Sequence, residues 1–143
     1  MILYMDTSAL VKRYFEEEMA QDTVKKCREA DLMATSCVAY AEALSAIYRK
    51  AREESINSGT LSMLVDTLEA EWDGFFRIPV NDSLNSIIKT LGANYPLRGF
   101  DSIHLASALL LQSRVSEQVV FACFDEKLVS AASSEGLKIF PQH

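Results

Sequence analysis

The sequence predicts an α/β fold, a three-layer α/β/α sandwich with a central parallel sheet. Short apolar runs such as ILYM (residues 2–5) and VVFAC (residues 119–123) alternate with longer segments of helical periodicity, an alternation typical of parallel sheets covered by helices. The composition is 49% hydrophobic and 24% charged, as in ordinary globular proteins. No repeat, low-complexity tract or Pro/Gly/Ser linker divides the 143 residues. We therefore expect one domain spanning residues 1–143.

The first quarter of the chain contains two expected strands and two expected helices. ILYM is short and wholly apolar, as buried strands are. In residues 8–17 the apolar side chains recur at helical spacing and share one face. A second helix is expected over about residues 20–30, followed by a strand at LMAT, residues 32–35.

The middle of the chain predicts a helical pair and an edge strand. Residues 37–52 form a long helical pattern that is apolar as far as Tyr48 and basic afterwards. Residues 57–59, Asn-Ser-Gly, are a turn signal, and the next helix is expected from Leu61 to Trp72. FRIPV, residues 76–80, reads as a strand, and its proline, which cannot donate a ladder hydrogen bond, favours an edge position.

The C-terminal part repeats the alternation. Pro96 and Gly99 predict a loop, and Gly136 ends the last helix before a final strand. The expected elements are helices at residues 82–93, 101–112 and 126–134, and strands at residues 119–123 and 137–140.

Composition also excludes several classes of protein. No apolar run is long enough to span a bilayer, and no basic region precedes the first apolar run, so we expect a cytoplasmic protein without a membrane segment. Three cysteines without CxxC spacing and two distant histidines argue against a disulfide framework or a zinc site. The formal net charge of -6 counts mildly against a nucleic-acid partner, although local basic patches could still attract one.

Four acidic residues, Asp6, Glu42, Asp101 and Asp125, lie inside hydrophobic stretches or directly end them. An ionised carboxylate buried there without a partner is costly. Asp6 and Asp125 each follow an expected strand, at the end where α/β folds bind ligands. Asp101 opens an expected helix, and Glu42 lies in mid-helix with no cationic residue three or four positions away. Such a cluster of carboxylates implies a bound cation.

Each acid also has a simpler interpretation. Asp6, Asp101 and Asp125 could cap the helices that follow them, although Thr7 and Ser8 offer alternative caps in the first case. Glu42 could face solvent. The metal interpretation requires that the four acids lie close together in the folded chain.

Oxygen ligands favour Mg²⁺ or Mn²⁺ over zinc. Such an ion lowers the pKa of bound water and stabilises the oxygens of an in-line displacement at phosphorus. Phosphodiester hydrolysis is the chemistry that this combination predicts.

Four segments, MDTSALVKRYFEEE, the Ala41-Glu42 helix, LRGFDSIHLASAL and VVFACFDEKL, together resemble the PIN-domain ribonucleases, particularly the VapC-like toxins of toxin–antitoxin pairs. The resemblance covers most of the chain. It implies a PIN-like fold in which Asp6, Glu42, Asp101 and Asp125 bind Mg²⁺ or Mn²⁺ and activate water for RNA cleavage. It also implies a homodimer held inactive by a cognate antitoxin, often through an antitoxin C-terminal segment that reaches into the acidic pocket.

Two residues near the acids bear on this resemblance. Ser8 matches a small hydroxyl residue of the family and is expected to orient Asp6 or a water. Cys123 stands where many members have Ser or Thr, and a thiol is a poorer hydrogen-bond partner. The resemblance therefore bears less directly on the geometry around Asp125 than on that around the other acids.

His104 could shuttle protons, but packing on an apolar helix is the favoured interpretation. Trp72 is expected in the core or at a dimer contact. A set of basic residues are candidate phosphate contacts, any one of which could equally be a solvated surface charge: Lys12, Arg13, Arg49, Lys50, Arg52, Arg98 and Lys127.

Three alternative functions remain open. An aspartyl-phosphate phosphatase usually has a second Asp two residues after the first, where this chain has Ser8. A phosphoacceptor receiver could use Asp82 but lacks a Lys in the required place. A non-catalytic, protein-binding PIN module usually loses one or more acids, and none is missing here.

Overall fold

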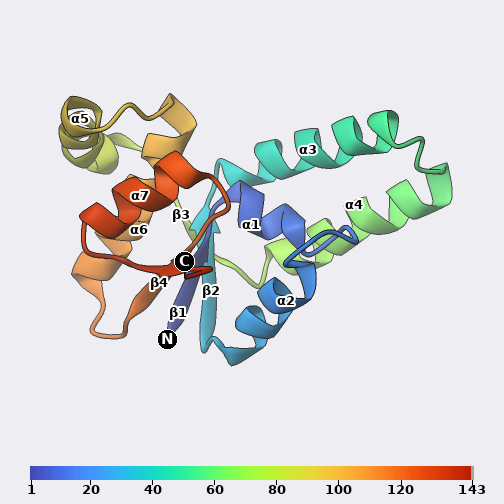
Figure 1. The fold of residues 1–143 in the computed structure, drawn as a ribbon, viewed down its shortest axis with the longest axis horizontal. Coiled ribbons are helices and arrows are strands. Elements are labelled where there is room, and N and C mark those ends of the chain that lie inside the picture. The colour runs from blue at the N-terminus through green and yellow to red at the C-terminus, as the bar shows by residue number, and fades with distance from the viewer. Residues whose placement is uncertain (143) are drawn as a thin grey trace.

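The computed structural model describes residues 1–142 and places five parallel strands in one sheet, in the order β3-β2-β1-β4-β5 (Figure 1). Helices cover both faces, so the predicted α/β/α sandwich with a parallel sheet is confirmed. The strands are β1 (Ile2–Met5), β2 (Leu32–Ser36), β3 (Phe76–Ile78), β4 (Val119–Ala122) and β5 (Lys138–Phe140).

The central strand β1 shows why both faces must be covered. All four of its side chains are buried, and they alternate between two hydrophobic clusters. Ile2 and Tyr4 belong to one cluster, whereas Leu3 and Met5 belong to the other. A strand with apolar side chains on both faces is stable only between two layers of helices.

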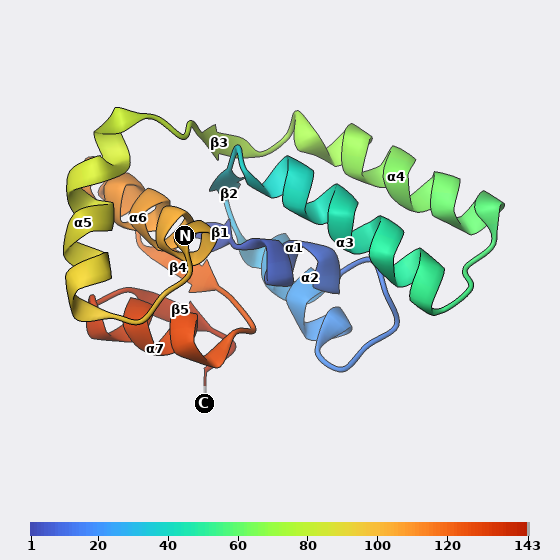
Figure 2. The ribbon, with the colours of Figure 1, turned by 90° about the horizontal axis from the view of Figure 1, so that it is seen from above.

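The helices divide between these two layers. The first four, α1 (Thr7–Lys12), α2 (Ala20–Glu29), α3 (Ala39–Glu53) and α4 (Ser58–Trp72), cover the Leu3 face. A single 3-10 turn (Asp82–Leu84) leads into the other group, α5 (Asn85–Asn94), α6 (Gly99–Arg114) and α7 (Glu126–Ser134), on the Tyr4 face. Figures 1 and 2 show α3 and α4 side by side, extending beyond the sheet.

The order of the strands reverses between β1 and β4, which lie next to each other in the centre of the sheet. Asp6 directly follows β1, and Asp125 comes shortly after β4. Parallel strands end at the same edge, so the fold brings both segments to the position where such sheets usually bind ligands. The predicted edge position of β3 is also confirmed.

Two local predictions were wrong. The first helix ends at Lys12 instead of residue 17, and Arg13 uses its side-chain Nε to bind the Leu10 carbonyl at 3.1 Å. The other error concerns residues 57–59, because α4 already begins at Ser58. The Asn57 side chain accepts a hydrogen bond from the Thr60 amide and so caps this helix, where we had expected a separate turn.

Helix starts also differ from expectation. The Cys37 amide bonds the Ile78 carbonyl and the Val38 amide bonds the Ser36 hydroxyl, so α3 begins only at Ala39. Glu42 therefore lies in the first turn, not in mid-helix. Gly99 is the first residue of α6 instead of part of a loop. Within residues 1–142, no helix combines the length and apolarity needed to cross a membrane.

Candidate active site

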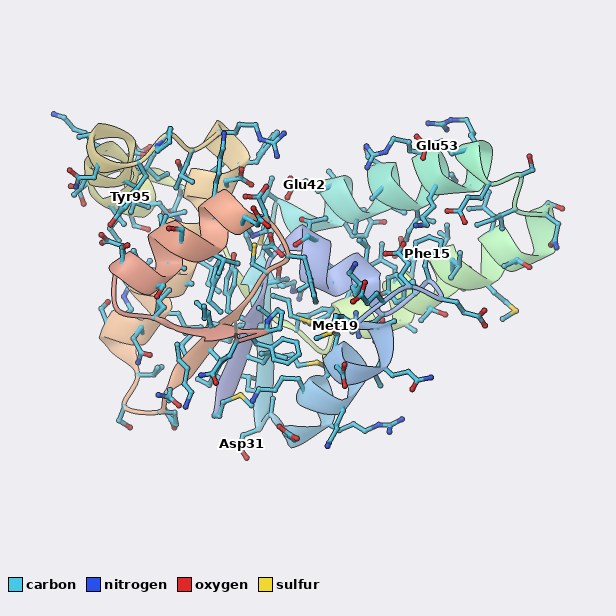
Figure 3. The ribbon with its side chains drawn as sticks, in the orientation of Figure 1. Phe15, Met19, Asp31, Glu42, Glu53 and Tyr95 are labelled. Carbon is cyan, nitrogen blue, oxygen red and sulfur yellow. The ribbon has the colours of Figure 1, made fainter. Side chains whose placement is uncertain are left out.

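Three adjoining hollows lie at the carboxyl ends of the strands, and Arg98 lines all of them. The largest, of about 690 Å³, includes Glu42; the second joins Glu42 to Asp101, and the third joins Asp101 to Asp125. We call these three hollows together the carboxylate depression. In Figure 3, Glu42 lies at the start of α3, near the beginning of α1. Three of the four predicted acids therefore line one continuous surface.

Asp6 lies just beneath this surface and is 4% exposed. Its Oδ1 accepts hydrogen bonds from the Ala9 amide at 3.0 Å and the Ser8 hydroxyl at 2.6 Å. The Cys123 thiol lies 3.1 Å from Oδ2. Burial nevertheless outweighs these partners and the nearby His104, and it raises the pKa of Asp6. Asp6 thus caps α1, and Thr7 and Ser8 do not replace it as alternative caps.

Glu42 has two protein partners, both from outside its own helix. The Thr7 hydroxyl donates to Oε1 at 2.6 Å, and His104 Nε2 lies 2.8 Å from the same oxygen. Burial works to raise the pKa of Glu42, but the hydrogen bonds from His104 and Thr7 and the nearby charge of Arg98 lower it overall. The expectation that Glu42 lacks a partner was therefore wrong, because only neighbours on the same helix could be judged from the sequence.

Asp101 and Asp125 reach the carboxylate depression from the starts of α6 and α7, respectively. Asp101 lies in the first turn of α6 without capping it, and its Oδ2 is 3.4 Å from Nε of Arg98. Asp125 caps α7 by accepting from the Leu128 amide at 2.9 Å. Arg98 is 84% exposed at its side chain, so this ion pair contributes little to stability. Its location makes Arg98 available to a ligand.

Cys123 and Ser8 connect the segments after β1 and β4. The Ser8 hydroxyl, besides binding Asp6, accepts from the Phe124 amide at 3.0 Å. Cys123 contacts Asp6 through its thiol, and the Asp125 amide approaches the same sulfur at 3.3 Å. Burial, reinforced by the Asp6 charge, raises the pKa of the thiol, which therefore stays protonated.

Basic and aromatic side chains surround the carboxylates. Lys12, Arg49 and Arg98 line the largest hollow, and Lys127 lines the third. Phe100 is 56% exposed at the wall. Such a mixture of cations and exposed rings suits a single nucleic-acid strand.

Arg13 does not belong to this group. Its side chain is only 7% exposed and binds Glu71 of α4 at 2.8 Å, so the suggestion that it contacts phosphate was wrong.

The chemistry of the ligands fits a hard cation, although they do not form a closed cage. Among residues 1–142, no three His, Cys, Asp or Glu side chains are grouped closely enough to hold a metal ion. Mg²⁺ usually takes one or two carboxylates and keeps several waters, in contrast to ions that require an all-protein cage. Carboxylate oxygens on an open surface are compatible with that preference.

Two contributors to the site were missed in the sequence. Thr7 was considered only as a helix cap, yet it binds Glu42. Tyr4 was read as part of an apolar strand, yet its hydroxyl lies 2.9 Å from His104 Nδ1. A phenol in a fully buried strand was the available signal, because a buried hydroxyl requires a partner. His104 is packed as expected, being 2% exposed, but it also contacts Glu42.

Comparisons with known proteins agree with this architecture. A family model described as the PIN domain matches residues 3–133. Ribonuclease VapC45 and Ribonuclease VapC49 of Mycobacterium tuberculosis (strains CDC 1551 / Oshkosh and ATCC 25618 / H37Rv) are each 28% identical over 98% of this chain and 95% of their own length.

Solved structures with the same fold include FitAcB from Neisseria gonorrhoeae, with a TM-score of 0.72 and 16% identity over 98% of this chain and 96% of that one. VapBC-1 from nontypeable Haemophilus influenzae has a TM-score of 0.62 and 16% identity over 97% and 96% of the two chains. At such identities these structures support the fold alone. Because the family model covers most of its length, the chain belongs to the PIN-domain family.

Proposed function

We propose that this protein is a metal-dependent endoribonuclease, the toxin of a toxin–antitoxin pair, and that residues 1–143 act as one nuclease domain. The observation that supports it best is the carboxylate depression at the reversal of strand order, with Glu42, Asp101 and Asp125 on its walls and Asp6 beneath. The curated relatives VapC45 and VapC49 are named ribonucleases, which favours RNA as the substrate.

Asp6, Glu42, Asp101 and Asp125 would hold Mg²⁺ or Mn²⁺, with water filling the remaining positions. Such an ion would supply a water of lowered pKa and positive charge that stabilises the transition state at phosphorus. Thr7 and His104 keep the Glu42 carboxylate ionised. Ser8 holds Asp6 through Oδ1, and its contact with the Phe124 amide ties that carboxylate to the segment leading to Asp125.

The protein's cations would bind the rest of the RNA. Arg98 is exposed and borders all three hollows, so its guanidinium can reach a phosphate next to the scissile one. Arg49 adds positive charge to the largest hollow, where Lys12 is paired with Glu17 at 3.1 Å. Phosphate contacts of this kind give affinity and position the strand without reading its sequence.

The partners are part of the proposal. The resemblance to VapC-like toxins implies a homodimer and a cognate antitoxin. Two of the solved structures with this fold carry the joint names FitAcB and VapBC-1, consistent with a second component. Co-expression with a small protein encoded beside the gene would test this partner, which should suppress nuclease activity when bound.

Cleavage assays test the enzymatic proposal. The purified protein should cut labelled RNA in Mg²⁺ or Mn²⁺, and EDTA should abolish the cut. Persistent cleavage in EDTA would contradict the metal-dependent mechanism. Hydrolysis of a small phosphomonoester in place of RNA would favour the aspartyl-phosphate phosphatase. Absence of both reactions would favour a non-catalytic, protein-binding PIN module.

A further inference from the structure

A chain of side-chain contacts runs from the centre of the sheet to the wall of the carboxylate depression. The Tyr4 hydroxyl lies 2.9 Å from Nδ1 of His104, and Nε2 of the same ring lies 2.8 Å from Glu42 Oε1. Tyr4 is fully buried, and His104 is 2% exposed. Each ring nitrogen of His104 therefore contacts a protein side chain, and neither contact is with solvent.

The buried phenol determines where the imidazole proton lies. Tyr4 is fully buried, and its hydroxyl carries one hydrogen that it can donate to Nδ1. An Nδ1 that accepts this proton must present its lone pair, and a neutral imidazole then carries its hydrogen on Nε2. The Nε2 hydrogen points at Glu42, which as a carboxylate can only accept.

The second partner of Glu42 agrees with this direction. The Thr7 hydroxyl donates to Oε1 at 2.6 Å, which leaves its own lone pairs free to accept from His104 Nε2 at 3.2 Å. Both donors converge on Oε1, and across residues 1–142 no hydrogen-bond donor reaches Oε2. One carboxylate oxygen is thus fixed, whereas the other is left for a ligand.

Packing alone does not account for these residues. The neighbouring inward positions of α6 include Leu105 and Ala108, which fill the core without polar atoms. Burying an imidazole against a phenol is unfavourable unless the two groups are paired. The pairing of Tyr4 with His104 places Nε2 against the Glu42 carboxylate. A leucine in place of His104 could not hydrogen-bond that carboxylate.

We propose that His104 is a positioning residue, whose tautomer is set by Tyr4 and whose Nε2–H fixes the Glu42 carboxylate so that Oε2 is presented to the cation. The presentation of Oε2 to the cation rests on the proposed function, in which Glu42 binds the metal. The tautomer set by Tyr4 and the hydrogen bond from Nε2–H to Glu42 are properties of the metal-free protein. Mutating a residue that hydrogen-bonds a metal ligand typically lowers metal affinity 10- to 100-fold.

The tautomer can be measured directly. The chain has two histidines, so a nitrogen-15 correlation spectrum of the imidazoles is simple, and His104→Gln identifies the signal. We expect hydrogen on Nε2 in the metal-free protein and a shift towards a mixture of tautomers in Tyr4→Phe. Hydrogen on Nδ1 in the unmodified protein, or an unchanged tautomer in Tyr4→Phe, would overturn the role of Tyr4.

Calorimetric titration with Mn²⁺ tests the consequence for the site. His104→Leu should weaken binding at least tenfold, Tyr4→Phe several-fold, and His104→Gln less than the leucine variant because an amide N–H can replace Nε2–H. Tyr95→Phe, which removes a phenol paired with Glu135 away from the site, is the control and should not change binding. If His104→Leu fails to fold, the glutamine and Tyr4 variants still decide the matter.

The outcomes separate the two proposals. Mn²⁺ affinity that is unchanged in His104→Leu and Tyr4→Phe would overturn the positioning role while leaving the nuclease proposal intact. An unmodified protein that binds no Mn²⁺ contradicts the metal-dependent function and the presentation of Oε2 to a cation, whereas the tautomer measurement still decides the role of Tyr4.

Discussion

The Cys123 thiol lies 3.1 Å from Asp6 Oδ2, across the two strands between which the strand order reverses. Met5 and Ala122 are paired in the ladder of β1 and β4, so the residue after each strand meets its counterpart at the sheet edge. The thiol is a weak donor to a buried carboxylate that is already difficult to ionise. Cys123 therefore bears on Asp6 at least as directly as on Asp125.

Replacing Cys123 with serine should strengthen this contact. A hydroxyl is a better donor than a thiol, so Cys123→Ser should lower the pKa of Asp6, and the acidic limb of the pH–rate profile should move to lower pH. Cys123→Ala removes the donor and should move that limb to higher pH. Profiles of kcat/KM for RNA cleavage would check this, and identical acidic limbs in the two variants would contradict it.

Asp6→Asn and Glu42→Gln should change stability in opposite directions. The pKa of Asp6 is raised, so its ionisation opposes folding and stability falls as the pH rises through that pKa. Glu42 has a lowered pKa, so its ionisation favours folding, and this stability is lost as the pH falls through that pKa. Near neutral pH without metal, Asp6→Asn should raise the free energy of unfolding, whereas Glu42→Gln should lower it.

Urea denaturation in EDTA, from acidic to neutral pH, provides the measurement for this pair. Both variants should lose nuclease activity, so the Asn variant should be more stable and inactive. Destabilisation by Asp6→Asn at neutral pH would show that its hydrogen bonds outweigh the burial of its charge.

Removing Arg98 should weaken RNA binding without unfolding the protein. The side chain is exposed and its ion pair with Asp101 is worth little, so stability should change by less than about 0.5 kcal/mol. RNA affinity should fall, and the slope of log affinity against log salt should decrease by roughly one charge's share, about 0.7. Arg114→Ala, at the opposite end of α6, is the matched control. Equal losses in both variants would mean that the effect is general electrostatics.

Arg13 should instead determine stability. Its guanidinium is almost fully buried, whereas Glu71 is 30% exposed and keeps a hydrogen bond from the Tyr14 hydroxyl, so Arg13→Ala should cost about 1.5–3 kcal/mol. Thermal denaturation would measure the loss, and RNA affinity of the folded fraction should stay near that of the unmodified protein. A stable variant with weakened RNA binding would return Arg13 to the list of phosphate contacts.

Local patterns predicted most of the fold because the periodicity of each segment reports its own burial. The run ILYM and the start of α7 at Glu126 appear where the sequence indicates them. The end of α1 could not be foreseen, because Arg13 there bonds the Leu10 carbonyl and also Glu71, 58 residues away. Helix ends depend on such partners, which periodicity does not contain.

The candidate site, like the fold, could be predicted from the sequence only in part. Asp6 and Asp125 could be placed together because parallel strands end at one edge. The partners of Glu42 could not, because Thr7 and His104 come from other elements and meet it only after folding. The helical neighbours of Glu42 include no cation, and its partners are supplied by tertiary contacts.

The claim that these four acids bind one or two metal ions is tested most directly by Mn²⁺ titration of single variants. Asp6→Asn, Glu42→Gln, Asp101→Asn and Asp125→Asn should each weaken Mn²⁺ binding, by tenfold or more. Asp66→Asn, on the exposed side of α4, should bind Mn²⁺ like the unmodified protein. If the unmodified protein binds no Mn²⁺, or if the four variants bind it as tightly as Asp66→Asn does, the acids do not form a metal centre.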